Sequence, residues 1–303
     1  MISSKKILVF TLDAGFGHRK AAKAIADAFQ SEYGGSIECK VINPLKEDGI
    51  TGILNKSQKY YDETSREHRG MYQAAYETIN RYPISLFADQ LVTQLIIREV
   101  LNTLIAEKPD GIISTFPIFN THVRRVLDLL RLHIPFYSVV TDLENVHRLW
   151  FQSGPDKYFV ASEQLKAQAI KTGVKQGRVF VSGIPVDIRI PCKARDKAAI
   201  RQDLGWDLTL PSVVAIGSKR VNHFYEKLCA VEDCGLPVQL CVVAGGDEEL
   251  YNKVSSKAWK IPTHCYNYVE NVPELLMASD ILISKAGGLI TSEGLACGLP
   301  MMI

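Results

Sequence analysis

Short apolar runs rich in β-branched residues alternate with longer helical patterns along this chain, and the alternation starts twice. In the first half, the strand-like runs occupy residues 5–12, 36–44, 110–116, 135–142, 157–162 and 178–183. Apolar strands separated by helices are typical of a parallel sheet that is covered on both faces. The first half is therefore predicted to form a doubly wound, Rossmann-like α/β domain.

The pattern begins again after the segment GIPVDIRIPCKARD, which carries two prolines and a cluster of charges. The new strand-like runs occupy residues 211–217, 238–246, 263–269 and 281–288. A chain of 303 residues with 47% apolar side chains is long enough for two hydrophobic cores. We therefore expect two Rossmann-like domains, 1–185 and 186–303, with the boundary near Val186.

The second domain is expected to be incomplete. Residues 287–303 predict a turn, a helix and the start of a strand, at which the sequence stops. A doubly wound domain that ended on an open edge strand would expose unpaired backbone groups.

Residues 52–106 are about three times longer than an ordinary crossover helix requires. The segment is rich in Tyr, Phe and Leu. It fits a pair of helices with a buried stripe. It also fits an amphipathic insertion that takes up an apolar substrate or lies on lipid.

Composition narrows the classes of function. The formal net charge is only +2, which gives no support to nucleic-acid binding. The seven cysteines include no C-x-x-C pair and several lie in apolar runs, so a reducing, cytosolic setting is expected. No window reaches the roughly 18 uninterrupted apolar residues of a spanning helix, so any membrane contact is expected to come from the surface.

The first candidate site follows the first predicted strand. Gly15 and Gly17 fall at a strand-to-helix turn, where backbone amides face whatever binds above the sheet. A dinucleotide fingerprint would require a further glycine where Lys20 stands, which argues against NAD. The turn instead offers His18 beside Asp13, a pair suited to taking a proton from a hydroxyl group. A structural role for this histidine is the alternative.

The second candidate site follows the strand at 135–142 and has the spacing T-D-x4-H-x2-W. It places Thr141, Asp142, His147 and Trp150 at the carboxyl end of a parallel strand, where ligands bind in open α/β sheets. Asp142 is suited either to orienting His18 or to contacting a hydroxyl group. The alternative is a capped turn with a solvated histidine.

The third candidate site is the most specific. A buried strand ends in Ser284 and Lys285, a pair of glycines follows, and a helix opens whose N-terminus points back across the turn. This arrangement suits a diphosphate, held by Lys285 or by the amides of Gly287 and Gly288. Glu293 is placed to accept hydrogen bonds from the ribose hydroxyls.

Together these segments resemble the monogalactosyldiacylglycerol synthase and processive diacylglycerol glucosyltransferase group of glycosyltransferase family 28. DAGFGHR stands for the family's glycine-rich turn that ends in histidine, and TDLENVHRLW keeps its T-D-x4-H-x2-W spacing. The segment before the interdomain linker is kept as Gly183-Ile184-Pro185-Val186. KAGGLITSEGLACGLP stands for the block K-x-G-G-x-T-x-x-E with G-L-P behind it.

The resemblance implies a GT-B fold, in which an N-terminal acceptor-binding domain and a C-terminal UDP-sugar-binding domain face each other across a cleft. It implies inverting transfer of a hexose from a UDP-sugar to a membrane lipid such as diacylglycerol, with no metal and no cofactor beyond the donor. It also implies a cytoplasmic protein attached peripherally to the inner face of the cell membrane.

The resemblance also assigns roles to residues. His18 would be the catalytic base, supported by Asp13, and Asp142 is the further catalytic candidate from the second site. The UDP-sugar would be held by residues of both glycine turns and of one loop, namely Gly15, Gly17, Tyr268, Val269, Ser284, Lys285, Gly287, Gly288 and Glu293. His147 and Trp150 would line the acceptor side.

One loop departs from the family. Where the family has a glycine-rich loop after the first strand of the second domain, this chain has Gly217-Ser218-Lys219-Arg220, which replaces backbone approach by cationic side chains. Three alternatives stay open: transfer to a polyprenyl-linked or small-molecule acceptor, a UDP-sugar 2-epimerase of the same architecture, and a non-catalytic UDP-sugar binder.

Overall fold

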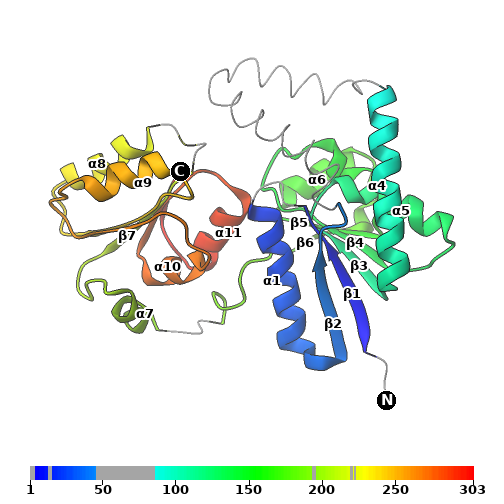
Figure 1. The fold of residues 1–303 in the computed structure, drawn as a ribbon, viewed down its shortest axis with the longest axis horizontal. Helices are drawn as coiled ribbons and strands as arrows, with labels where there is room; N and C mark the ends of the chain where they lie inside the picture. Colours follow the sequence, from blue (N-terminus) through cyan, green and yellow to red (C-terminus); the bar gives the residue numbers. More distant parts are fainter. Residues whose placement is uncertain (1–3, 13–15, 46–85, 193–195, 219–220, 222) are drawn as a thin grey trace. The chain divides into compact units, whose positions relative to one another are not determined.

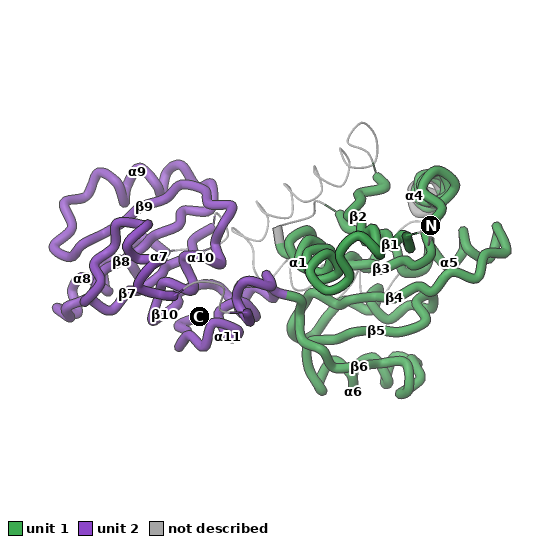
Figure 2. The backbone as a smooth tube through the Cα atoms, turned by 90° about the horizontal axis from the view of Figure 1, so that it is seen from below, with its two compact units in different colours: residues 1–185 green, residues 186–303 purple. Residues whose placement is uncertain are grey.

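The structure is a computed structural model that describes residues 4–12, 16–45, 86–192, 196–218, 221 and 223–303. The chain divides into two compact units, Met1–Pro185 and Val186–Ile303 (Figure 2). Each unit is built on its own parallel sheet, and each is described separately below.

The described part of unit 1 contains six strands, all parallel, in the spatial order β2-β1-β3-β4-β5-β6. The strands are β1 (Lys5–Phe10), β2 (Ile37–Ile42), β3 (Gly111–Ser114), β4 (Phe136–Val139), β5 (Lys157–Val160) and β6 (Val179–Val181). The helices are α1 (Phe16–Tyr33), α4 (Leu86–Glu107), α5 (Ile118–Leu129) and α6 (Glu163–Lys171), with short 3-10 helices η1 (Gly34–Ser36), η2 (Arg148–Phe151) and η3 (Gln176–Arg178).

Alternation of side chains along β1 explains the layers of unit 1. Leu8 and Phe10 pack with residues of α4 and α5 on one face of the sheet. Val9 packs with residues of α1 on the other face. Figure 1 shows α1 alongside β1 and β2, and α4 beside α5. The predicted three-layer α/β architecture of this half is confirmed.

Helix α4 contains the last part of the unusually long segment 52–106. Its buried residues Ile96, Val100 and Leu104 recur every fourth position and join the core beneath α5. Residues 46–85, which hold the rest of that segment, lie outside the described residues. Among the helices that the structure describes, none combines the length and the apolar character needed to span a bilayer.

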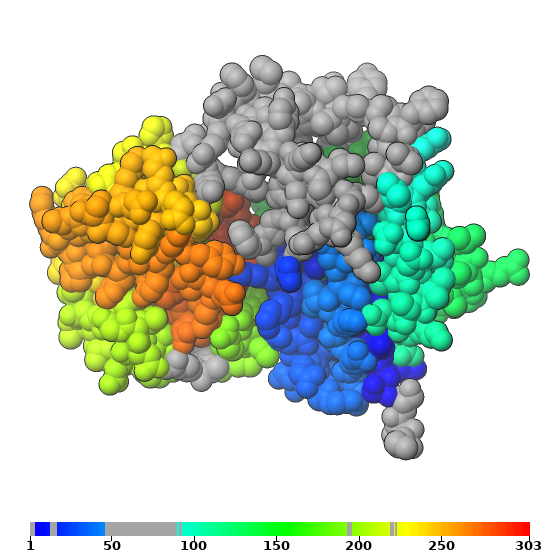
Figure 3. All heavy atoms as spheres, viewed as in Figure 1, coloured from blue at the N-terminus to red at the C-terminus, as the bar shows by residue number. Residues whose placement is uncertain are grey.

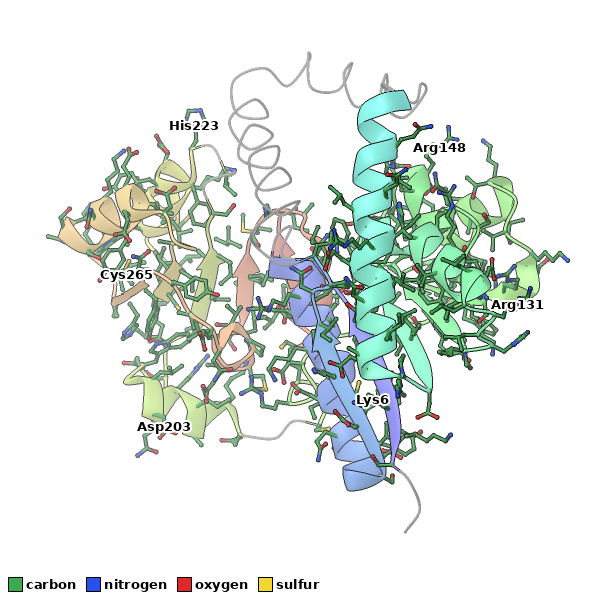
Figure 4. All side chains as sticks on the ribbon, turned by 45° about the vertical axis from the view of Figure 1, so that its right-hand side comes forward. Lys6, Arg131, Arg148, Asp203, His223 and Cys265 are labelled. Atoms are coloured by element: carbon green, nitrogen blue, oxygen red, sulfur yellow. The ribbon has the colours of Figure 1, made fainter. Side chains whose placement is uncertain are left out.

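The turn after α5 carries apolar side chains outside the core. Leu129 and Leu132 are 68% and 39% exposed, and the turn projects from unit 1 in Figure 3. Arg131, labelled in Figure 4, lies between them with a positive φ of 53°. Because this turn leads into the start of β4, it lies at the amino edge of the sheet, away from the carboxyl ends of the strands.

Unit 2 repeats the plan with five parallel strands among its described residues, in the order β11-β10-β7-β8-β9. The strands are β7 (Ser212–Ile216), β8 (Gln239–Val243), β9 (Thr263–Tyr266), β10 (Ile281–Ile283) and β11 (Met301–Met302). The helices are α7 (Lys197–Leu204), α8 (Phe224–Asp233), α9 (Glu248–Ser256), α10 (Val272–Ala278) and α11 (Gly288–Ala296).

Strand β7 separates two cores in unit 2. Val214 packs with residues of α7 and α10 on one face. Val213 and Ala215 pack with residues of α8 and α9 on the other face. Both faces of the sheet are therefore covered by helices, as the continuous apolar run at 211–217 predicts.

Candidate functional site

In each unit the central candidate residue, His18 in unit 1 and Lys285 in unit 2, lies where the order of the strands reverses. From β1 the chain goes to β2 on one side and later to β3 on the other, and β1 and β3 are neighbours. In unit 2 the corresponding neighbours are β7 and β10. Open α/β sheets bind ligands outside the carboxyl ends of such strand pairs.

His18, in the first turn of α1, is held by residues that follow β3 and β4. Its Nδ1 atom lies 3.1 Å from the carbonyl oxygen of Thr115 and 2.5 Å from Oγ1 of Thr141. Thr115 is itself fixed, because its amide donates to Phe10 at the end of β1 over 2.9 Å. The structure thus brings His18 to the reversal point of unit 1.

The contact with Thr115 decides which imidazole nitrogen can act as a base. A carbonyl oxygen only accepts hydrogen bonds, so Nδ1 of His18 must carry the proton in this contact. In the neutral imidazole the lone pair then lies on Nε2. His18 is therefore arranged to take up a proton at Nε2.

Burial is the main influence on the charge of His18. It lowers the pKa of the imidazole below its ordinary value, and the negative charge of Asp142 and the Thr115 carbonyl act in the opposite direction. The Phe116 ring stands edge-on to the imidazole, with 4.9 Å between the centroids and 86° between the planes. A depressed pKa keeps His18 neutral at physiological pH, as a base requires.

Asp142 does not hold Nδ1 of His18, which Thr115 and Thr141 contact instead. Its Oδ2 atom accepts a hydrogen bond of 2.8 Å from Nε1 of Trp150. Trp150 is only 1% exposed, so its indole belongs to the core of unit 1 and presents almost no surface to a ligand.

His147 caps η2 through its side chain. Its Nδ1 atom accepts a hydrogen bond of 3.2 Å from the Leu149 amide. Burial and the positive charge of Arg148 lower the pKa of His147. Arg148 lies at the outer surface of unit 1 (Figure 4). The structure thus gives His147 a capping contact, as in the alternative interpretation of this motif.

The first glycine turn is only partly described. Gly17 lies in the first turn of α1, one residue before His18. Asp13 and Gly15 lie outside the described residues, so the predicted support of His18 by Asp13 stays a prediction.

In unit 2 the glycine pair forms the predicted turn between β10 and α11. The Gly287 amide donates to the Lys285 carbonyl over 2.7 Å, so the turn itself uses this amide, which the sequence assigns to a ligand. A Cβ at Gly287 would lie 3.7 Å from Cε of Lys285, which places the lysine stem over the turn. Ser284 is 9% exposed at the end of the strand.

The N-terminus of α11 faces this turn. Gly287 caps the helix without a side-chain hydrogen bond, and the first intrahelical bond runs from the Thr291 amide to the Gly287 carbonyl. The amides of Gly288 and of the two residues after it come before that bond and therefore donate to no carbonyl within the helix. The start of the helix is thus suited to binding an anion. Glu293, one turn further on, is 3% exposed.

Close packing fixes the position of α11. A Cβ at Gly294 would lie 2.7 Å from Cδ2 of Leu282 and 2.9 Å from Sδ of Met301. Only a glycine lets the helix approach β10 and β11 this closely. The turn before the helix is placed by the same contact.

The remaining predicted residues lie at the same edge of the unit 2 sheet. Tyr268 follows β9 and is 50% exposed, and Val269 packs partly into the core. Gly217, which ends the β7 run, approaches Gly245 so closely that a Cβ on Gly245 would lie 2.5 Å from the Gly217 carbonyl oxygen. Lys219 and Arg220 lie outside the described residues.

Thr115 was not predicted as a site residue, and Thr141 only as part of a motif. Thr115 acts on His18 through its main-chain carbonyl, for which no residue type is a signal. Its place directly after β3, the neighbour of β1, would have identified it once the strand order was known. Among the described residues, no cluster of His, Cys, Asp or Glu could hold a metal ion.

Comparison with known proteins identifies relatives over the whole chain. The sequence profile of a family described as "Monogalactosyldiacylglycerol (MGDG) synthase" matches residues 18–186. Monogalactosyldiacylglycerol synthase 3 of Arabidopsis thaliana is 29% identical over 99% of this chain and 66% of its own length. The Spinacia oleracea monogalactosyldiacylglycerol synthase is 30% identical over 99% of this chain and 59% of its own. The chain thus spans about three fifths of the length of these relatives.

Solved structures share the fold. The Staphylococcus aureus MnaA–UDP complex matches with a TM-score of 0.60 and 14% identity, over 99% of this chain and 79% of that one. UDP-GlcNAc 2-epimerase from Neisseria meningitidis, bound to UDP-GlcNAc, matches with a TM-score of 0.61 and 14% identity, over 99% and 82%. The predicted GT-B type of fold is confirmed.

Proposed function

The chain belongs to the monogalactosyldiacylglycerol synthase family, and we propose that it transfers a hexose from a UDP-sugar to diacylglycerol with inversion at the anomeric carbon. The observation that carries this proposal is the arrangement of His18. Its Nδ1 is tied to Thr115 and Thr141, which leaves Nε2 as the base at the reversal point of unit 1. The family supplies the class of donor and acceptor.

On the acceptor side, His18 removes a proton from the free hydroxyl of diacylglycerol. Nε2 takes this proton while the hydroxyl oxygen forms a bond to the anomeric carbon, and the bond from that carbon to the β-phosphate oxygen breaks. UDP leaves from the opposite face, so the configuration inverts. A general base of this kind contributes about 10²- to 10⁴-fold to the rate.

On the donor side, the turn between β10 and α11 binds the diphosphate. Lys285 and the start of α11 supply positive charge to the leaving group, where such charge stabilises the transition state. Ser284 and Gly288 border the same turn. In this proposal Glu293 accepts hydrogen bonds from the ribose, and the backbone at Tyr268 and Val269 meets the uracil.

The proposed acceptor fixes where the reaction takes place. Diacylglycerol stays in a bilayer while a UDP-sugar is dissolved in the cytosol, so the chain works at the cytoplasmic face of the cell membrane. Attachment to that face is peripheral in this proposal, and the lipid enters through unit 1, where His18 lies.

A donor screen tests the proposal. The full-length protein is incubated with diacylglycerol vesicles and radiolabelled UDP-glucose, UDP-galactose or UDP-N-acetylglucosamine, and the lipid fraction is separated. We expect labelled glycolipid with at least one hexose donor, and NMR of the product should show the β-anomer. UDP binding without a lipid product would favour a non-catalytic binder, and UDP-N-acetylmannosamine formed without acceptor would favour an epimerase.

Two histidine variants test whether His18 is the base in this transfer. His18→Gln should abolish transfer while the affinity for UDP, measured by calorimetry, stays nearly unchanged. His122→Gln is the matched control, because Nδ1 of His122 also contacts a backbone carbonyl, that of Ile118 at 2.5 Å, but the residue lies within α5. Equal loss in both variants would remove His18 from the mechanism.

A further inference from the structure

Trp150 connects the candidate base to a carboxylate although its side chain is almost fully buried. Its Nε1 atom donates to Oδ2 of Asp142 over 2.8 Å. Its ring centroid lies 6.2 Å from that of His18, with 41° between the planes. The indole therefore donates a hydrogen bond to the charged carboxylate of Asp142 and lies beside the imidazole of His18, which becomes positively charged during the proposed reaction.

The main chain at and after Trp150 is held against α5. Its carbonyl accepts a hydrogen bond of 2.8 Å from Nδ2 of Asn120, a residue of α5 that is fully buried. The chain after η2 packs directly on α5, since a Cβ at Gly154 would lie 2.0 Å from the Asn120 carbonyl oxygen. These contacts hold the main chain, and the packing of the almost fully buried indole in the core restricts the orientation of its N–H.

Asp142 supplies the charge that acts on His18. The carboxylate follows β4 and is partly exposed, and its charge favours the protonated imidazole whereas burial disfavours it. Among the described residues, the other groups that contact the imidazole are neutral: the carbonyl of Thr115 and the ring of Phe116 after β3, and the hydroxyl of Thr141 after β4. A carboxylate in a loop would be free to turn toward water unless it is held in place.

We infer that Trp150 is a positioning residue whose indole N–H holds the Asp142 carboxylate where its charge stabilises the imidazolium of His18. This inference rests on the proposed function only in naming the acceptor hydroxyl as the source of the proton. After the transfer, the proton resides on Nε2 of His18, and the negative charge of Asp142 stabilises the positive ring at the moment that UDP leaves. The role goes beyond the ligand contact that the motif suggests for Trp150.

The test is an NMR titration that needs no substrate. The Cε1–H resonance of His18 is followed against pH in the full-length protein and in Asp142→Asn, Trp150→Phe and the double variant. Trp150→Phe keeps an aromatic ring but removes the N–H group. His264, a residue of unit 2 whose pKa is lowered by burial, is the internal control and should titrate identically in all four proteins.

The expected result is directional. Asp142→Asn lowers the pKa of His18 further, because the group that raises it is lost. Trp150→Phe lowers the pKa in the same direction, and the double variant titrates as Asp142→Asn alone, since an asparagine has no charge left to position. A His18 titration unchanged by Trp150→Phe, or additive shifts in the double variant, would overturn the inference.

A second replacement guards against loss of folding in Trp150→Phe. Site-specific exchange of Trp150 for benzothienylalanine puts sulfur where the N–H stands and keeps the bicyclic shape. It should lower the pKa of His18 as Trp150→Phe does, with circular dichroism unchanged. Wild-type titration of His18 in this protein would also overturn the inference.

Measurements of sugar transfer distinguish a failure of this inference from a failure of the proposed function. If transfer is detected, both Trp150→Phe and Asp142→Asn should lower kcat about tenfold with little change in the KM for the UDP-sugar. If no donor yields a product, the proposed function fails while the titration still decides the role of Trp150. If transfer occurs but the titration is unchanged, only the positioning role fails.

Discussion

The imidazole Nδ1 of His18 lies 3.1 Å from the carbonyl oxygen of Thr115, so the residue after β3 determines the tautomer of a residue at the start of α1. The carbonyl is held because the Thr115 amide bonds to Phe10, the last residue of β1. The two neighbouring strands at which the chain reverses thereby orient the proposed base. This contact does not depend on the side chain at position 115, because any residue there would present a main-chain carbonyl.

The pH dependence of kcat/KM should reflect the lowered pKa that burial gives to His18. Burial lowers the pKa of the imidazole, and Asp142 and the Thr115 carbonyl offset only part of that effect. The base is active when neutral, so kcat/KM should rise with pH and level off with a midpoint below the ordinary histidine value of about 6.5. A profile of initial rates between pH 4.5 and 9 measures this, and a midpoint above the ordinary value would contradict it.

Thr141→Val should weaken the hold on the base without disturbing the fold. Valine keeps the shape of this side chain, which is 5% exposed, but removes the Oγ1 atom 2.5 Å from Nδ1 of His18. We expect kcat to fall about three- to tenfold, the scale of one neutral hydrogen bond, with the KM for the UDP-sugar unchanged. Steady-state kinetics measure this. Thr141→Ser, which keeps the hydroxyl, is the control and should stay near wild-type kcat.

Lys285→Ala should weaken UDP binding by about tenfold, because a cation over the diphosphate turn is lost. Titration calorimetry with UDP measures the effect, and its size should shrink at high salt. Lys253→Ala is the control, since Lys253 lies on α9 and pairs with Glu249 at 2.8 Å. Equal affinities for both variants would move the diphosphate away from this turn.

Gly294→Ala should destabilise unit 2 and displace the helix that carries the proposed donor site. The added Cβ would meet Leu282 at 2.7 Å and Met301 at 2.9 Å, both within the core. Overpacking of this kind costs about 1 to 3 kcal/mol of unfolding free energy, measured by urea denaturation. Gly177→Ala is the control, because a Cβ there meets nothing within 4 Å and should leave the unfolding midpoint unchanged.

Some features of the site depend on local sequence patterns and could be predicted. Others depend on contacts between distant segments and could not. Strand ends can be located from apolar runs, so the places of His18, Asp142 and Lys285 could be predicted. Contacts between elements could not, because they depend on strand order and on exact packing. Thr115 contacts His18 through a main-chain carbonyl, and the indole of Trp150 is buried although the motif suggests an acceptor contact.

Asp280 should stabilise unit 2 at neutral pH and lose that effect in acid. Partial burial acts to raise the pKa of Asp280, but hydrogen bonds from Lys197, the Ser212 amide and Arg201 outweigh it and lower the pKa below the ordinary value of 3.8. With the folded-state pKa depressed, the unfolded chain binds the proton more readily, so the stabilisation is present above that ordinary value and disappears as pH falls through the folded-state pKa.

Asp280→Asn should therefore lower the unfolding free energy at pH 7 by about 1 kcal/mol, a value kept small because the carboxylate is 36% exposed and screened. The difference from wild type should become smaller in acid, as urea denaturation at pH 7 and at pH 3 would show. Asp233→Asn, an exposed change on α8, is the control and should have little effect at either pH. A deficit for Asp280→Asn that persists unchanged at low pH would mean that the three donors recognise the shape of the side chain and not its charge.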